Sequence, residues 1–172
     1  VGEHRKRQVV QVGVVLPPGG FFVVVADTNV FAAKYPAVTS VIGNWTGTLN
    51  NSDENIRLTD DLGNTVDEVF YADEGDYAIR VRGAQDYNHR GWDWQATHDG
   101  GGKSLERINP ALTGACGQNW AASIPTNGTP GSVNSTFAAN IAPLIREVAH
   151  YPLVPRSTEP VTITAQLTDE QT

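Results

Sequence analysis

Glycine and proline interrupt this chain so frequently that a fold built on long helices is excluded. The 172 residues include 17 glycines and 10 prolines. Both residue types break helices, and clusters of them between short apolar runs are typical of strands joined by turns. Because 40% of the residues are hydrophobic, the chain is still able to bury a core. We therefore expect a folded all-β protein with short strands.

The most regular pattern lies between residues 41 and 71. Apolar residues alternate with polar ones over residues 45–49, and again where Ile56 and Leu58 flank Arg57. Polar turns separate these runs from each other and from a third extended run. Such alternation predicts antiparallel strands with one buried face. Short strands at about ten-residue spacing indicate a sandwich or a barrel.

The segments on either side of this region add further strands. Residues 9–16 and 21–26 are rich in valine and predict a buried hairpin around the intervening Pro-Pro-Gly-Gly turn. Asp27, or one of the two residues after it, is expected to cap a short helical turn over residues 30–34, which Pro36 ends. Further strands are expected at residues 103–108, 120–124 and 161–167, and residues 125–135 are rich in turn formers.

Residues 72–102 differ from the rest of the chain because they are polar, aromatic and rich in glycine. Only residues 77–81 show an obvious strand pattern there. A segment of this length is either a functional loop or a hairpin extension that folds over the sheet. In the strand that follows, Leu105 is expected to be buried between the polar residues Ser104 and Glu106.

Several of these local patterns, taken in order, carry a resemblance. They lie at residues 17–27 (PPGGFFVVVAD), 45–49 (WTGTL), 54–58 (ENIRL), 61–67 (DLGNTVD), Tyr71, 102–107 (GKSLER), 120–123 (WAAS) and 129–134 (TPGSVN). This series resembles the lamin tail domain, known from nuclear lamins and from bacterial exported proteins. The resemblance implies an immunoglobulin-like β-sandwich.

The resemblance also implies a division of the chain. Residues 16–135 are expected to form the sandwich, residues 136–160 a linker, and residues 161–172 the first strand of a following immunoglobulin-like domain. Lamin tail domains usually open with a strand rich in acidic residues and tryptophan, and nothing before Leu16 matches it. The sandwich is therefore expected to be incomplete at its N-terminus, with residues 1–15 as a segment that replaces one strand.

The chain has no methionine, so it is expected to be a piece of a longer protein. A sandwich that lacks a strand exposes an unpaired edge, which predicts self-association.

The resemblance implies a non-catalytic structural or adhesive module of a multidomain bacterial protein that is extracellular, on the cell surface or periplasmic. The alternative is an accessory domain of an enzyme, a spore-coat-type kinase or a metal-dependent hydrolase, whose catalytic part lies outside this chain. A nuclear structural domain is a third reading, but the heptad rod that precedes a lamin tail is missing.

Charge and motifs exclude other classes of function. The net charge of −7 is opposite to that of most nucleic-acid-binding proteins, so no nucleic acid is expected as a partner. No apolar run approaches the roughly 18 residues of a membrane span. The single cysteine, Cys116, excludes an internal disulfide framework. Residues 100–104 are similar to a phosphate-binding loop, but Thr97 stands where that motif needs glycine. No kinase or hydrolase motif occurs.

The most promising ligand-binding residues lie in the aromatic and polar segment. Aromatic side chains beside polar ones on a loop are typical of recognition surfaces. Candidate ligand-binding residues are Tyr77, Tyr87, His89, Trp92 and Trp94. A protein or carbohydrate partner suits them. In the alternative interpretation, the two tryptophans anchor a long loop onto the sheet.

Two weaker patterns concern metals, and no other cofactor is expected. Asp73, Glu74 and Asp76 supply the carboxylates that calcium prefers, although the EF-hand spacing is absent. A zinc ion would find nitrogen ligands in His89 and His98, with an oxygen from Asp93 or Asp99, but this spacing fits no closed motif.

Overall fold

The computed structural model describes residues 15–45 and 47–170, and most of its regular structure is β-strand. The strands are β1 (Val23–Val25), β2 (Val41–Gly43), β3 (Asp53–Thr59), β4 (Thr65–Ala72), β5 (Ile79–Asp86), β6 (His89–Gln95), β7 (Leu105–Arg107), β8 (Trp120–Ala122), β9 (Leu144–Tyr151) and β10 (Thr162–Thr168). The described helical elements are α1 (Thr28–Lys34) and two 3-10 turns, η1 (Gly75–Tyr77) and η2 (Gly117–Asn119). The prediction of an all-β protein is confirmed.

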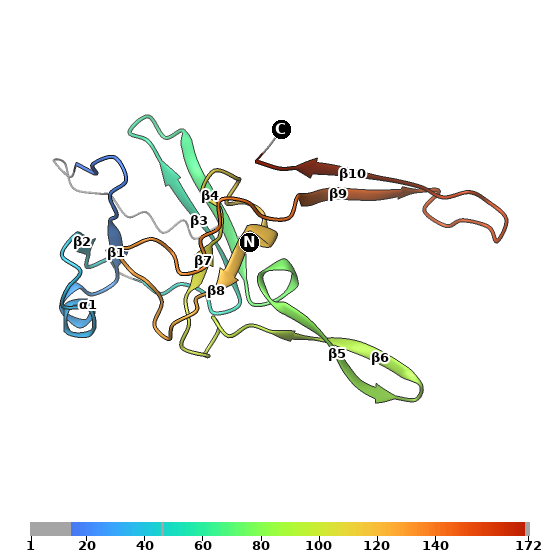
Figure 1. The fold of residues 1–172 in the computed structure, drawn as a ribbon, viewed down its shortest axis with the longest axis horizontal. Helices are drawn as coiled ribbons and strands as arrows, with labels where there is room; N and C mark the ends of the chain where they lie inside the picture. Colours follow the sequence, from blue (N-terminus) through green and yellow to red (C-terminus); the bar gives the residue numbers. More distant parts are fainter. Residues whose placement is uncertain (1–14, 46, 171–172) are drawn as a thin grey trace.

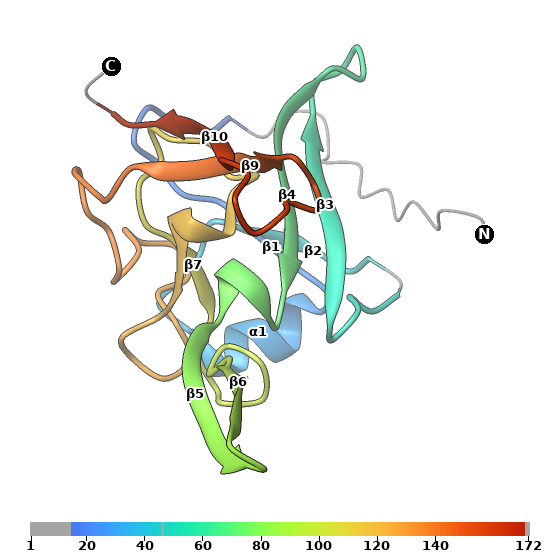
Figure 2. The same ribbon diagram turned by 90° about the vertical axis from the view of Figure 1, so that its right-hand side faces the viewer.

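These strands form pairs rather than larger sheets. Four pairs are antiparallel, β3–β4, β5–β6, β7–β8 and β9–β10, and β1–β2 is parallel. The short β7–β8 pair lies near the middle of the molecule, and the three longer antiparallel ribbons extend away from it in different directions (Figure 1). The view in Figure 2 shows the same arrangement. Within the described residues each ribbon has open edges, and self-association through such an edge stays a prediction.

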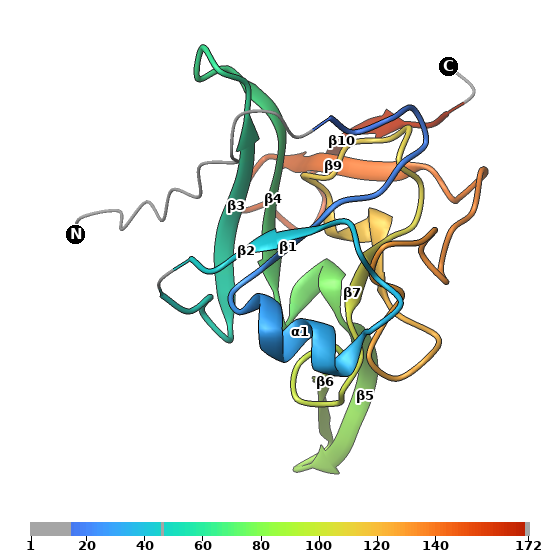
Figure 3. The same ribbon diagram turned by 90° about the vertical axis from the view of Figure 1, so that its left-hand side faces the viewer.

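The N-terminal strand pair differs from the predicted hairpin. Residues 9–14 lie outside the described residues, and β1 pairs instead with β2, with Val23 opposite Val41. Parallel strands need a crossover between them, and α1 lies within that crossover (Figure 3). The predicted helical turn is confirmed. Asp27 Oδ1 accepts hydrogen bonds from the backbone N–H groups of Asn29 and Val30, at 2.8 and 3.0 Å.

The β3–β4 ribbon confirms the predicted antiparallel pairing but not its buried face. Its turn has Gly63 at φ +88°, a conformation that glycine adopts without strain. Ile56 and Leu58 are 44% and 57% exposed, because no second sheet among the described residues covers this ribbon. Residues 47–49 form no strand, so the run predicted over residues 45–49 is also wrong for its described part.

The centre of the molecule is small and partly polar. Its apolar cluster consists of Leu112, Cys116 and Leu144, with Ile141 packed against it. Glu106 in β7 is only 3% exposed, whereas Leu105 is only partly buried. We expected Leu105 to be the buried residue, but its neighbour Glu106 is more buried. Successive residues of a strand face opposite sides, and in β7 it is Glu106 that faces the interior.

Two asparagines join the loops at this centre. The backbone N–H of Asn109 donates to Asn119 Oδ1 at 2.8 Å, and Asn119 Nδ2 donates to the carbonyl of Asn109 at 2.8 Å and to that of Thr113 at 3.1 Å. Asn109 and Asn119 are 2% and 0% exposed. Buried amides of this kind stabilise a fold only when their hydrogen bonds are made. These contacts hold the segment between β7 and β8 in place.

The C-terminal region contains a hairpin where a linker was predicted. β9 spans Leu144–Tyr151, inside the expected linker, and β10 pairs with it, Thr162 opposite Tyr151. The prolines at 143 and 152 flank the strand rather than interrupt it. A strand over residues 161–167 was predicted correctly in position, but its partner was missed. The division of the chain into domains stays a prediction.

No helix of the described residues has the length and apolar character needed to span a bilayer. The α-helix α1 has 7 residues, against the roughly 20 that a membrane span requires.

Candidate ligand-binding surface

The β5–β6 hairpin carries four of the five predicted ligand-binding residues. Its two-residue tip consists of Tyr87 and Asn88, with φ values of 44° and 62°, between the paired residues Asp86 and His89. Positive φ at both tip residues is typical of the type I′ turns that join antiparallel strands. The segment is therefore a hairpin, and it extends away from the rest of the molecule instead of folding over a sheet (Figure 1).

The register of this hairpin gathers two arginines and two tryptophans on one face. Arg80 is opposite Trp94, and Arg82 is opposite Trp92. Residues opposite each other, or two apart in one strand, share a face of the ribbon. We call these four residues the Arg–Trp face. Trp92 and Trp94 remain 45% and 42% exposed.

Within the Arg–Trp face, both guanidinium groups lie near one indole ring. The Cζ atoms of Arg80 and Arg82 are 4.3 and 4.1 Å from the ring centroid of Trp92. Such contacts contribute about 0.5–1 kcal/mol each at exposed sites. Trp92 therefore orders two cations, and within the described residues no cation is recorded over Trp94.

The other face of the hairpin is different in character. Ile79 pairs with Gln95, and Val81 pairs with Asp93. A Cβ at Gly83 would lie 3.3 Å from Asp93 Oδ2, so this carboxylate lies against the strand backbone on the face that Val81 shares. The hairpin thus separates Asp93 from the two stacked arginines.

The structure brings some of the predicted ligand-binding residues together and separates others. Trp92 and Trp94 share one face, while Tyr87, 91% exposed, and His89 lie at the tip. Tyr77 belongs to η1, next to the base of the hairpin. The sequence pattern did not single out the two arginines of the Arg–Trp face. Arginine and tryptophan each recur at a spacing of two on either side of the Tyr87 tip, but the register shift between Arg82 and Gln85 that brings them to one face has no signature in the sequence.

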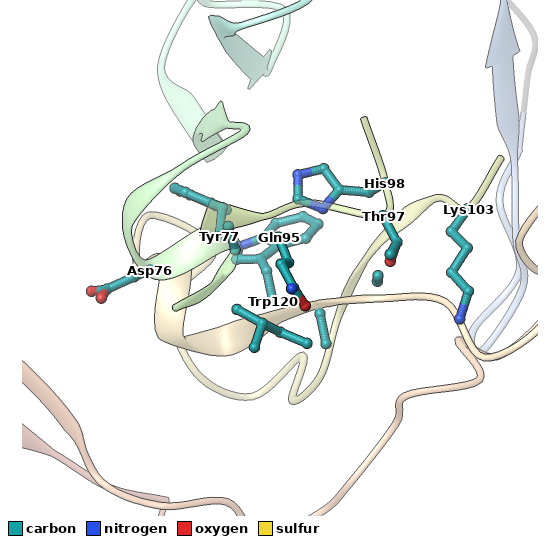
Figure 4. Close-up of a pocket in the computed structure, with 11 residues that line it drawn as sticks. Asp76, Tyr77, Gln95, Thr97, His98, Lys103 and Trp120 are labelled. Carbon is teal, nitrogen blue, oxygen red and sulfur yellow. The ribbon is translucent and has the colours of Figure 1, made fainter. Parts of the chain in front are cut away.

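A pocket of about 240 Å³ lies at the base of the hairpin. It is lined by Asp76, Tyr77, Ala78, Ile79, Gln95, Thr97, His98, Lys103, Trp120, Ala121 and Ala122. Figure 4 shows Lys103 and Asp76 at opposite sides of it, with the carboxylate of Asp76 pointing away. His98 Nε2 lies 3.0 Å from the carbonyl oxygen of Ala72, and Trp120 Nε1 donates to the carbonyl of Gly114 at 2.9 Å. Two of the larger polar groups at the pocket are therefore engaged in holding neighbouring loops.

Tyr77 contributes more to packing than to an open surface. A Cβ at Gly117 would lie 3.0 Å from its ring, so η1 and η2 approach each other closely at this point. Burial raises the pKa of the Tyr77 hydroxyl, and the nearby Cys116 and Asp76 raise it further. Tyr77 therefore joins the two turns.

Comparisons with known proteins do not add an assignment. No family model, curated protein or solved structure matches this chain.

The residues considered for metal binding are not gathered into a site. In the part of the chain that the structure describes, no three histidine, cysteine, aspartate or glutamate side chains lie together so that they could hold a metal ion. Asp76 Oδ2 instead accepts a hydrogen bond from Gln118 Nε2 at 3.0 Å, so it joins η1 to η2. His89 lies at the hairpin tip and His98 beside its base. In the described residues, nearness in sequence does not bring these side chains into one site.

The most strongly constrained ionisable group is Glu106. Its carboxylate accepts hydrogen bonds from the hydroxyls of Thr129 at 2.5 Å and Ser135 at 2.7 Å, and from the backbone N–H of Thr136 at 3.2 Å. Burial alone would raise the pKa of Glu106, but these hydrogen bonds outweigh it and hold the pKa below its ordinary value. At 3% exposure the carboxylate does not face solvent. Its hydrogen bonds fasten the 129–136 loop to β7, so Glu106 is a structural residue.

Proposed function

We propose that this chain is a non-catalytic binding module related to the lamin tail domain, whose fold is an immunoglobulin-like β-sandwich. The module is part of a larger bacterial exported or cell-surface protein. It binds a carbohydrate ligand through the β5–β6 hairpin. The ordered series of turn and strand patterns over residues 16–135 supports the lamin-tail assignment. The Arg–Trp face supports the carbohydrate-binding role.

The observation that carries the binding role is the exposure of two tryptophans on one face of a projecting ribbon. Trp92 and Trp94 are 45% and 42% exposed and take no part in the apolar cluster around Leu144. An aromatic ring of this kind offers a flat apolar surface at low conformational cost. The C–H face of a sugar ring is also flat and apolar, so it suits such a platform. Two such rings on one face of the ribbon offer a larger platform than a single exposed ring such as that of Tyr151.

The test is the double substitution Trp92→Ala with Trp94→Ala. Binding to a polysaccharide panel is measured by affinity electrophoresis, and the melting temperature by differential scanning fluorimetry. We expect affinity for the bound polysaccharide to fall at least tenfold. The melting temperature should change by no more than about 2–3 °C, because substitutions of exposed residues usually alter stability little.

The matched control is Tyr151→Ala, which removes an aromatic ring that is 76% exposed on the β9–β10 ribbon. This variant should bind as well as the unaltered protein. Equal loss of binding in both variants would contradict the assignment to the hairpin. A drop of 10 °C or more in the double variant would show that the tryptophans are part of the stabilising structure instead.

A further inference from the structure

The Arg–Trp face holds two positive charges next to each other. Arg80 and Arg82 both lie over the ring of Trp92, at 4.3 and 4.1 Å from its centroid. Among residues 15–45 and 47–170, neither arginine forms an ion pair, in contrast to Arg57, which pairs with Glu68 at 3.1 Å. The chain as a whole has a net charge of −7. The Arg–Trp face therefore places two positive charges side by side on an acidic protein.

Stacking leaves the hydrogen-bonding edge of each guanidinium available. A cation–π contact uses the flat face of the group, whereas its N–H donors lie in the plane and match the two oxygens of a carboxylate. One donor of Arg82 lies 3.5 Å from the backbone oxygen of Arg90, a long contact that holds the side chain weakly. Both arginines are exposed. Trp92 thus orders the two groups while their donors remain open to a ligand.

We infer that the Arg–Trp face binds an acidic polysaccharide, with Arg80 and Arg82 contacting its carboxylate groups and Trp94 stacking on a sugar ring. This inference rests on the proposed function and specifies its ligand. The two arginines are two residues apart in β5, which places their Cα atoms about 6.5–7 Å apart along the strand. They can therefore contact separate anionic groups of one polymer, and an anion between them relieves their mutual repulsion.

The small size of the cationic surface favours a uronic acid polymer over a nucleic acid. Nucleic-acid binding depends on a broad basic surface that neutralises many phosphates. Here the cationic surface of the hairpin is small, and Asp93 and Asp86 lie in the same hairpin. Uronic acid polymers combine carboxylates with apolar C–H faces, and the Arg–Trp face offers a group suited to each. The ligand chemistry is therefore a carboxylated sugar chain.

The experiment measures binding of the full 172-residue chain to polygalacturonate, alginate and hyaluronate, with highly methyl-esterified pectin as the matched neutral polymer. We expect at least one acidic polymer to bind. The double substitution Arg80→Gln with Arg82→Gln should weaken that binding at least tenfold and leave binding to esterified pectin unchanged. Trp94→Ala should weaken binding to both kinds of polymer. Raising the salt from about 50 to about 500 mM should weaken only the acidic interaction.

Two further variants separate charge from geometry. Arg57→Gln removes one positive charge elsewhere on the surface and should alter binding less than twofold. Arg80→Lys with Arg82→Lys keeps both charges but loses the planar donor fork, and should weaken binding about threefold or more. Circular dichroism spectra and melting temperatures of all variants must match those of the unaltered protein.

Each contrary result has its own meaning. Binding to esterified pectin that depends on Trp94 but not on the arginines overturns the acidic-ligand inference and leaves the carbohydrate-binding proposal standing. No binding to any of the four polymers overturns both. Equally tight binding to single-stranded poly-dT with the same dependence on Arg80 and Arg82 shows a general polyanion site, and this overturns the assignment to a sugar polymer.

Discussion

The β7–β8 centre and the β5–β6 hairpin distribute polar and aromatic residues in opposite ways. At the centre, Glu106 and Asn119 are almost fully buried, and each has several hydrogen-bond partners. On the hairpin, Trp92 and Trp94 are large and aromatic but remain in contact with water. Buried polar groups with satisfied hydrogen bonds specify a structure, and exposed aromatic groups are available to a partner. Polarity alone therefore does not separate structural from functional residues in this protein.

This contrast predicts that the largest effect on stability comes from Glu106→Ala. The change leaves the donors of Thr129, Ser135 and Thr136 without their acceptor in a closed site. We expect a loss of about 3 kcal/mol or more in the free energy of unfolding, measured by urea denaturation. Asp61→Ala, an exposed carboxylate in the β3–β4 turn, is the control and should cost less than about 0.5 kcal/mol. If both variants lose similarly little unfolding free energy, the hydrogen bonds of Glu106 at the centre do not stabilise the fold more than an exposed carboxylate does.

The pH dependence of stability tests whether the buried carboxylate of Glu106 stabilises the fold through its charge. The pKa of Glu106 is lowered from its ordinary value of 4.5 in the folded protein, so the unfolded chain binds the proton more readily. Its contribution is fully present above about pH 4.5 and is lost as the pH falls through the folded-state pKa.

Urea denaturation of the unaltered protein and of Glu106→Gln between pH 7 and about pH 3 measures this contribution. The difference in unfolding free energy between the two proteins should be constant above about pH 5 and should narrow at lower pH. The remaining carboxylates are the same in both proteins and largely cancel in the difference. If the difference in unfolding free energy does not change over this pH range, the charge of Glu106 makes no contribution to stability.

The smallest expected effect lies at the hairpin tip. Tyr87 and Asn88 both have positive φ values, a conformation that asparagine followed by glycine adopts more easily. Tyr87→Asn with Asn88→Gly should slow amide hydrogen exchange in β5 and β6, which corresponds to a local gain of about 0.3–1 kcal/mol. The global urea midpoint should not move, because the ribbon opens independently of the centre. An equal rise in global stability would show that hairpin and centre unfold as one unit.

Local patterns were sufficient for the strands and turns whose pairing is close in sequence. The Asp27 cap, the Gly63 turn and the antiparallel pairing of β3 with β4 follow from residues only a few positions apart. The parallel pairing of β1 with β2 was missed, because a crossover connection leaves no local signature. β6 was not predicted as a separate strand because residues 89–95 are mostly polar and contain a glycine, although a hairpin extension was one of the two alternatives for residues 72–102.

The candidate surface was likewise predicted only where the signal is local. The sequence drew attention to Trp92 and Trp94 by their residue type alone. It did not indicate that Arg80 and Arg82 lie on the same face as these tryptophans, since that depends on a register shift between Arg82 and Gln85 in addition to the two-residue tip. The metal-binding hypotheses relied on nearness in sequence, whereas in the described residues these side chains form no cluster of three or more, and Asp76 accepts a hydrogen bond from Gln118.

The sequence was enough to determine an all-β chain of short strands, because glycine, proline and alternating residues act through local backbone preferences. Only the tertiary structure decided which strands pair, which faces are left uncovered, and that Glu106 is enclosed while its neighbour Leu105 is not. Local free energies differ too little between such alternatives to choose among them. The choice depends on hydrogen bonds and contacts between residues far apart in the chain, such as those that join Glu106 to the 129–136 loop.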